Sequence, residues 1–260
     1  MFDNNAPSPA PSDATVSAAD SVARDLADMI LTQMVPGASL PSEAELATRY
    51  GVSRLTIREA VKLLAGRGLL DLARGRRAVV REPDGSVFAD FLTAILHNDS
   101  KGLFDLVEVR FSLEMQSATL AAKRVNRAGL TAIETTLERM RQSAASDSPD
   151  AEADFHNADI AFHEAIALAS GNRVLGYLFE AMSGPLRNGV RISRHGQAAR
   201  GHTIQDTINA HQLILDAIRS GNGRAAGEAM RVHLKDTESD IRAALASMTN
   251  LRPTQTDLPR

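Results

Sequence analysis

Residues 36–70 read PGASLPSEAELATRYGVSRLTIREAVKLLAGRGLL and contain two signals for the start of a helix. The first is a capping box, in which the Ser42 hydroxyl accepts the backbone N–H of Glu45 and the Glu45 carboxylate bonds back to the N-cap. The second is Ser53, an N-cap preceded by Gly51, which can take the left-handed conformation that ends a helix. The stretch therefore predicts a helix, a tight turn and another helix.

The second helix of this pair, over 54–65, has two chemically distinct faces. Its apolar residues recur at helical spacing and would be buried: Ile57, Ala60, Val61 and Leu64. Its basic residues occupy every fourth position on another face: Arg54, Arg58 and Lys62. A helix that is apolar on one side and cationic on the other is typical of the recognition helix of a DNA-binding domain.

The sequence on both sides extends the same domain. Apolar residues at helical spacing predict a helix that begins near Val22 and ends before Pro36. Two short strands, 69–73 and 78–80, flank a turn rich in arginine. The pattern indicates a helix-turn-helix followed by a basic wing.

The charge distribution supports the same interpretation. Between Arg49 and Arg81 there are nine basic and two acidic residues, although the whole chain has a net charge of −3. A basic block within an acidic protein is the electrostatic signature expected of a DNA-binding module joined to another domain. On charge alone, a solvated basic face is the alternative.

Residues 22–82 resemble the winged helix-turn-helix of the GntR superfamily of bacterial transcription regulators, through the stretch quoted above and RGRRAVV at 74–80. The resemblance implies DNA contacts by Ser53, Arg54, Thr56 and Arg58 at the major groove or its phosphates, and by Arg74, Gly75 and Arg76 in the wing, where Arg74 and Gly75 approach the minor groove. Ala44 stands where the family commonly has arginine, which puts one expected contact in question.

Composition excludes several other classes of protein. The 260 residues, 27.9 kDa and 43% hydrophobic, are enough for two modest domains with real cores. The absence of cysteine excludes disulfides and thiolate metal sites. No apolar run approaches a membrane span and no secretory signal pattern is present, so we expect a cytoplasmic protein. With no Trp and only 2 Tyr, aromatic platforms for single-stranded nucleic acid are scarce.

The fold class expected is mostly α, an N-terminal winged helix-turn-helix domain followed by an all-α antiparallel helical bundle. We expect a disordered tail over 1–20, the DNA-binding domain over 21–82, a linker and connecting helix over 83–100, an effector- and metal-binding dimerisation domain over 101–248, and a flexible tail over 249–260. Helices are predicted near 86–97, 102–125, 128–146, 151–169, 172–190, 203–220 and 222–246.

Four of these helices place ionisable residues among apolar ones. Asp159 and His163 share one helical face at i and i+4, and His211 and His233 lie within the apolar faces of two later helices. Burying such groups is costly unless they are paired or bind a metal ion. We therefore predict a mononuclear metal site with these four ligands and open positions; His156 is a rival ligand, and separately satisfied core residues are the alternative.

Arg110 and Glu114 lie inside the apolar stripe of the helix over 102–125. A buried guanidinium beside a metal ion can bind a carboxylate or phosphate through two hydrogen bonds. An internal ion pair between Arg110 and Glu114 is the alternative.

The second domain, over about 87–246, resembles the FCD ligand-binding domain of the FadR subfamily. The matching pieces are EVR at 108–110, DIAFHEAI at 159–166, SGN at 170–172 and MRVH at 230–233. The resemblance implies that Asp159, His163, His211 and His233 hold zinc or a similar ion, and that a small organic acid reaches it. The residues expected at the effector are Arg110, Glu114, Ser170, Asn172 and Arg191.

Together these features predict a homodimeric transcription regulator, a repressor, that binds a pseudo-palindromic double-stranded operator and responds to a small organic acid. Zinc is the expected metal, with nickel and manganese as alternatives. No catalytic residue is assigned. Two other functions stay open, a metal-responsive regulator without an organic effector and a mononuclear metalloenzyme, for which Glu114 is the best candidate base.

Overall fold

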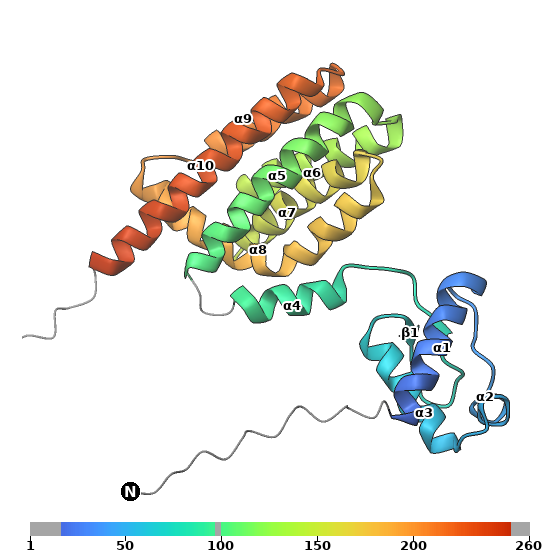
Figure 1. Cartoon of the computed structure of the whole chain (residues 1–260). Helices are drawn as coiled ribbons and strands as arrows, with labels where there is room; N and C mark the ends of the chain where they lie inside the picture. Colours follow the sequence, from blue (N-terminus) through green and yellow to red (C-terminus); the bar gives the residue numbers. More distant parts are fainter. Residues whose placement is uncertain (1–16, 97–99, 251–260) are drawn as a thin grey trace, which may run out of the picture. The chain divides into compact units, whose positions relative to one another are not determined.

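The computed structural model describes residues 17–96 and 100–250, apart from the side chains at 188–191 and at the segment ends 100 and 248–250 (Figure 1). The chain divides into two compact units, and the boundary between them lies between Asp84 and Gly85. Within the described segments, no helix is both long and apolar enough to span a bilayer.

The first unit is a winged helix-turn-helix. Its elements are α1 (Ala18–Gln33), α2 (Glu43–Tyr50), α3 (Arg54–Gly66), β1 (Leu70–Asp71) and β2 (Val79–Val80). The two strands pair antiparallel, with Leu70 opposite Val80 and Asp71 opposite Val79. The predicted wing is present, with strands shorter than the pattern predicted.

Local signals in the sequence account for the helix boundaries of this unit. Both hydrogen bonds of the predicted capping box form, from the Glu45 backbone to the Ser42 hydroxyl at 3.2 Å and from the Ser42 backbone to the Glu45 carboxylate at 2.7 Å. Gly51 ends α2 with φ +63°, in the left-handed region. Ser17 caps α1, so residues 18–20 are helical and the boundary expected at residue 20 lies three residues too late.

The second unit consists, in its described part, of helices only. They are α4 (Ser86–Leu96), α5 (Ser100–Arg124), α6 (Arg127–Ala144), α7 (Ala151–Ala169), α8 (Arg173–Ala199), α9 (Ile204–Arg219) and α10 (Gly223–Asn250). Helix α10 packs against α5, α8 and α9, and α7 packs against α5, α6 and α8 (Figure 1). A large apolar core unites α5, α6, α7, α9 and α10. This packing brings the predicted ionisable residues of α5, α7, α9 and α10 to one region.

Helix α8 corrects the sequence interpretation, which ended it at residue 190 and placed a break at His195-Gly196. The helix continues to Ala199, and Gly196 lies inside it against α10. A Cβ at Gly196 would lie 1.7 Å from the backbone oxygen of Asp240, so glycine permits a close approach of two helices here and does not end one. The chain turns only at Gly201, whose φ is +72°.

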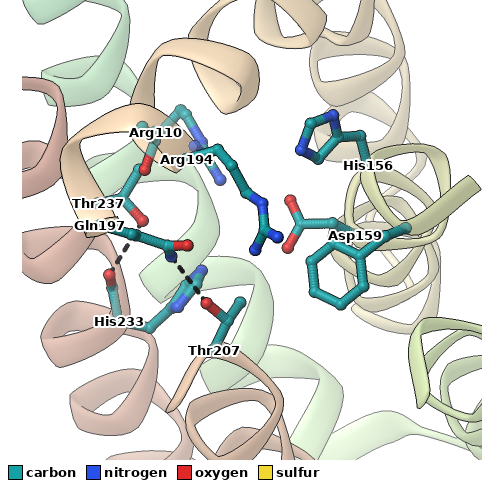
Figure 2. A pocket seen from close by; sticks show the side chains of 10 residues that line it. Arg110, His156, Asp159, Arg194, Gln197, Thr207, His233 and Thr237 are labelled. Atoms are coloured by element: carbon teal, nitrogen blue, oxygen red, sulfur yellow. Dashed lines mark hydrogen bonds between the residues drawn. The ribbon is translucent and has the colours of Figure 1, made fainter. Parts of the chain in front are cut away.

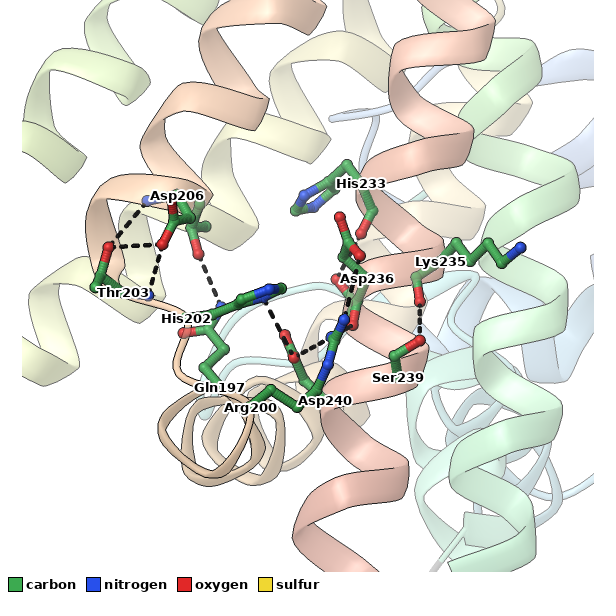
Figure 3. A network of polar contacts seen from close by, with 12 residues as sticks. Gln197, Arg200, His202, Thr203, Asp206, His233, Lys235, Asp236, Ser239 and Asp240 are labelled. Carbon is green, nitrogen blue, oxygen red and sulfur yellow. Dashed lines mark hydrogen bonds and ion pairs between the residues drawn. The ribbon is translucent and has the colours of Figure 1, made fainter.

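Polar contacts hold the end of α8 against its neighbours (Figure 3). The Arg200 guanidinium donates to the buried Asp240 carboxylate at 2.5 Å and lies 3.6 Å from Asp236. One turn earlier, the Gln197 amide donates to the Thr207 hydroxyl of α9 at 2.8 Å. The second half of α8 is thereby fixed beside the histidines described next.

Candidate metal centre and nucleic-acid interface

Three histidines from three helices meet in the interior of the bundle. His163 of α7, His211 of α9 and His233 of α10 are buried, and one ring nitrogen from each lies within 4.8 Å of the others. The centroids of the His211 and His233 rings are 4.5 Å apart. Three imidazoles at this spacing can surround a single divalent cation.

Hydrogen bonding of His211 leaves one of its nitrogens available to a cation. Nδ1 lies 2.8 Å from the backbone oxygen of Thr207. A carbonyl oxygen only accepts, so Nδ1 carries the proton and Nε2 presents a lone pair. Such a bond to the outer nitrogen is the usual support of a metal-binding histidine.

Asp159 joins the histidines from α7. One of its carboxylate oxygens lies 3.1 Å from His211 Nε2. Burial by itself would raise the Asp159 pKa, but the interactions with His211, His163 and His233 outweigh burial and lower it. For His233, burial and the nearby His211 and His163 lower the pKa, so its ring is neutral and can donate a lone pair. The set offers an anionic oxygen and three nitrogens.

Glu114 supports the centre from α5. Its carboxylate lies 2.5 Å from Arg110 Nε on one side and 2.5 Å from His163 Nδ1 on the other. Burial would raise the Glu114 pKa, but the charges of Arg110 and His163 prevail and lower it to about 2. Glu114 is therefore ionised; it accepts a hydrogen bond from Arg110 Nε, and its other oxygen lies against the His163 ring.

Two of the histidine nitrogens form no hydrogen bond. His163 Nε2 and His211 Nε2 are excluded from solvent and have no hydrogen-bond partner among the described residues, and His211 Nε2 has only its 3.1 Å contact with Asp159. An unsatisfied buried polar atom costs about 1–3 kcal/mol. A cation at the centre of the three rings would satisfy both atoms, so the donor set fits a divalent metal ion.

A pocket adjoins this centre and opens to solvent (Figure 2). Its enclosed cavity is about 30 Å³, and the space including the open mouth is about 410 Å³. Arg110, Asp159 and His233 form its inner part, and the remaining lining residues are Phe155, His156, Ser193, Arg194, Gln197, Thr207 and Thr237. All but Phe155 are polar, so the pocket suits a polar ligand.

Of the described residues predicted to bind the effector, the structure places only Arg110 in the lining of this pocket. Arg110 lines the pocket, and Glu114 lies behind it as the ion-pair partner, which was the alternative considered from sequence. Ser170 and Asn172 are absent from the pocket lining, and this corrects the expectation for them. The Ser170 hydroxyl donates to the Ala167 carbonyl, and the Asn172 side chain caps α8. The Arg191 side chain lies outside the described residues.

His156 lines the pocket and is not one of the three clustered histidines. Sequence reasoning missed the contributions of Ser193, Arg194 and Gln197 because it ended α8 too early. The sequence after residue 190 gives no clear helical signal, because Ile192 is the only large apolar residue between 191 and 199.

The predicted DNA-contacting residues lie on α3 and in the wing of the first unit. Ser53 caps α3 and its hydroxyl lies 2.9 Å from that of Thr56, whereas Arg54 is exposed at the start of the helix. Arg58 donates to both carboxylate oxygens of Glu43, at 3.1 and 2.7 Å. This pair is more than 40% exposed on both sides, so solvent screens it and a phosphate can compete for the guanidinium.

The predicted contact residues of the wing lie at its exposed tip. Arg74, Gly75 and Arg76 are all exposed, and Gly75 has φ +74°, a conformation that glycine adopts without strain. Ala44 is half-buried at the start of α2 and presents only a methyl group. The seven residues predicted to contact DNA thus lie on or at the start of α3 and in the wing, and residue 44 lacks a long side chain.

Comparison with known proteins finds two family matches. Residues 18–80 match the gntR family of bacterial regulatory proteins, and residues 105–236 match the FCD domain. Among curated proteins, the HTH-type transcriptional regulator LutR of Bacillus subtilis (strain 168) is 32% identical over 207 residues, which cover 79% of this chain and 92% of LutR.

Two further similarities agree with these matches. The galactonate operon transcriptional repressor of Escherichia coli (strain K12) is 34% identical over 199 residues, which cover 75% of this chain and 83% of the repressor. Among solved structures, a GntR protein of Streptococcus agalactiae is 29% identical, with a TM-score of 0.65, and the alignment covers 84% of this chain and 97% of that one.

Proposed function

The chain belongs to the GntR family of bacterial transcription regulators and carries an FCD domain, and from this premise we propose that it is a homodimeric repressor controlled by a small organic acid bound beside a divalent metal ion. Its relatives are DNA-binding regulators and not enzymes. The single observation that carries the proposal is the group of three buried histidines next to a polar pocket that contains Arg110.

For the metal, we propose zinc, held by Asp159, His163, His211 and His233. The unsatisfied Nε2 atoms of His163 and His211 support this assignment, as does the Thr207 carbonyl that orients His211. When bound, the ion supplies an open coordination position for a carboxylate. Its contribution here is binding and not catalysis.

For the effector, we propose an organic acid that contacts Arg110. Glu114 engages only Nε of Arg110, and the guanidinium lines the pocket. The name of the galactonate operon repressor connects a similar protein with the genes of a sugar acid. That connection favours hydroxylated acids over apolar ones for this chain too.

For DNA, we propose that Ser53, Arg54, Thr56, Arg58, Arg74, Gly75 and Arg76 contact a pseudo-palindromic operator. Two half-sites require two recognition helices, and therefore a dimer. We place the dimer contact at α4, where Val87, Phe88, Phe91 and Ile95 are 42–58% exposed. A contiguous exposed apolar face of this kind marks a protein interface.

The decisive test is fluorescence anisotropy of the purified protein on the DNA upstream of its own gene. A panel of small organic acids is added to zinc-loaded protein and to protein treated with a chelator. We expect at least one acid to weaken operator binding only while zinc is present. Operator binding that does not respond to any acid in either state would contradict effector control.

The same experiment examines one second candidate, a regulator whose signal is the metal ion itself. The short Arg110–Glu114 ion pair favours it, because a guanidinium that already has a carboxylate partner needs no ligand. DNA affinity that changes with zinc alone, and with none of the acids, would select this function.

A further inference from the structure

Two arginines from different helices line the pocket beside the candidate metal centre. Arg110 comes from α5 and Arg194 from α8, and the effector role discussed so far involves only the first. Arg110 is held by Glu114 and its side chain is 5% exposed. The Arg194 side chain is 29% exposed, and its guanidinium carbon lies 6.0 Å from the centroid of the Phe155 ring.

Arg194 has only a weak anionic partner. Its closest carboxylate contact in the described chain is Glu152, at 4.0 Å, and the Glu152 side chain is 61% exposed. An ion pair at this distance and exposure contributes little, because solvent screens it. The Arg194 charge is therefore available to a ligand in the pocket.

Arg194 also points toward Asp159 (Figure 2). Asp159 is also a proposed ligand of the divalent cation, so a bound cation would compete with Arg194 for this carboxylate. An anionic group of a ligand could then pair with Arg194.

The pocket offers two guanidinium groups from different helices. Arg110 already pairs with Glu114, whereas Arg194 has only its distant contact with Glu152. Two separate cationic contacts favour a ligand that carries two anionic groups.

We infer that the effector is a hydroxylated dicarboxylic acid, with one carboxylate bound by Arg110 and the other by Arg194, and that Arg194 selects diacids over monoacids. This inference rests on the proposed function and specifies its ligand. The hydroxyls of Ser193 and Thr207 and the amide of Gln197 supply hydrogen-bonding groups for the ligand's own hydroxyls.

The test is isothermal titration calorimetry of the zinc-loaded, full-length protein with matched acids that differ in the number of carboxylates. The pairs are malate with 3-hydroxybutyrate, glucarate with gluconate, and galactarate with galactonate. In at least one pair we expect the diacid to bind about tenfold or more tightly than the monoacid, the effect of one charge-assisted hydrogen-bonded contact.

Variants of α8 assign the preference to Arg194. Arg194→Gln should reduce the ratio of diacid to monoacid affinity to about threefold or less, with the zinc content unchanged. Arg194→Lys, which keeps the charge without the planar fork, should restore part of the ratio. Arg187→Gln, on the same helix and outside the pocket lining, is the control and should keep the wild-type ratio.

The outcomes separate this inference from the proposed function. Monoacids that bind as tightly as their diacids and release the operator would overturn the inference and leave the proposed function standing. An unchanged ratio in Arg194→Gln would overturn the role of Arg194. If no acid of either kind binds the zinc-loaded protein, the proposed function fails and this inference fails with it.

Discussion

At the level of single residues, His211 illustrates how a neighbouring group prepares a side chain for its role. Its Nδ1 is committed to the Thr207 carbonyl, so the other nitrogen faces His163 and His233 as a lone-pair donor. The orientation of the His211 ring is therefore set by a contact within one turn of α9 and does not require a bound ion. A histidine without this bond could rotate or exchange its tautomer and would bind a cation less tightly.

We expect His211→Ala to lower zinc affinity by more than about 100-fold, since the loss of an outer-shell partner alone typically costs 10–100-fold. The measurement is metal content by mass spectrometry after dialysis, with a competition titration for affinity. His195→Ala, which removes an exposed histidine of α8, is the control. Full zinc occupancy in His211→Ala would place the metal elsewhere.

Arg54 is the residue of α3 best placed to contact DNA, because it is exposed at the helix start while Arg58 is paired with Glu43. Arg54→Ala should weaken operator binding by about 5- to 150-fold, the range for the loss of a specific arginine contact. Arg139→Ala, an exposed arginine of the helical bundle, should leave binding unchanged. Anisotropy on operator DNA measures both, and equal affinity of the two variants would argue against this role for Arg54.

At the level of elements, the crossing of α8 over α10 shapes the pocket. Gly196 lets the α8 backbone approach Asp240, and the Arg200–Asp240 contact closes the same crossing. This crossing places Ser193, Arg194 and Gln197 against the pocket. A wider crossing would therefore move one wall of the effector site.

Two glycines of α8 should respond oppositely to alanine. At Gly196 a Cβ would meet backbone atoms of α10, so Gly196→Ala should destabilise the protein by about 3 kcal/mol or more. At Gly176 the nearest atom is the side-chain tip of exposed Leu168 at 3.0 Å, which can move. Gly176→Ala should be neutral or stabilising by up to about 1 kcal/mol. Urea unfolding measures both, and equal stabilities would contradict the close crossing.

At the level of the whole molecule, α4 carries the surface that a dimer requires. At about 100° per residue, Val87, Phe88, Phe91 and Ile95 fall within one arc of the helix, and Leu92 and Leu96 pack against the bundle on another side. The helix thus has an inner apolar face that is half-buried and an outer one that is exposed. A second copy of the chain is the partner we propose for the outer face.

Phe91→Asp should convert the dimer into a monomer, because it places a charge in the middle of the apolar face. Light scattering coupled to size-exclusion chromatography measures the mass. Thr93→Asp adds the same charge on the same helix outside this arc and should stay dimeric. If both variants elute as dimers, the interface lies on another surface.

The charge of the first unit makes a prediction for the intact regulator. The basic block between Arg49 and Arg81 implies release of counterions when it contacts phosphates, so operator affinity should fall steeply and linearly on a plot of log K against log salt. The slope of this plot should have the magnitude expected when the protein contacts several DNA phosphates. A flat plot would show that ionic contacts with DNA are few.

The sequence alone determined the parts of this protein that depend on neighbouring residues. The capping box at Ser42, the glycine at 51 and the two faces of 54–65 are local signals, and the elements formed where they predicted. The histidines could also be found, since a helical period of 3.6 residues shows which side chains face inward. That these histidines lie close together could only be a hypothesis from sequence, because it depends on how the three helices pack.

Only the tertiary structure decided what surrounds each of those residues. Glu114 became the partner of both Arg110 and His163, and Arg194 joined the pocket, through contacts between helices distant in sequence. Gly196 looked like the end of a helix because a local pattern cannot reveal the neighbouring backbone of Asp240. Local structure follows from short-range sterics and hydrogen bonds, whereas the identity of a partner across the core depends on how whole helices pack.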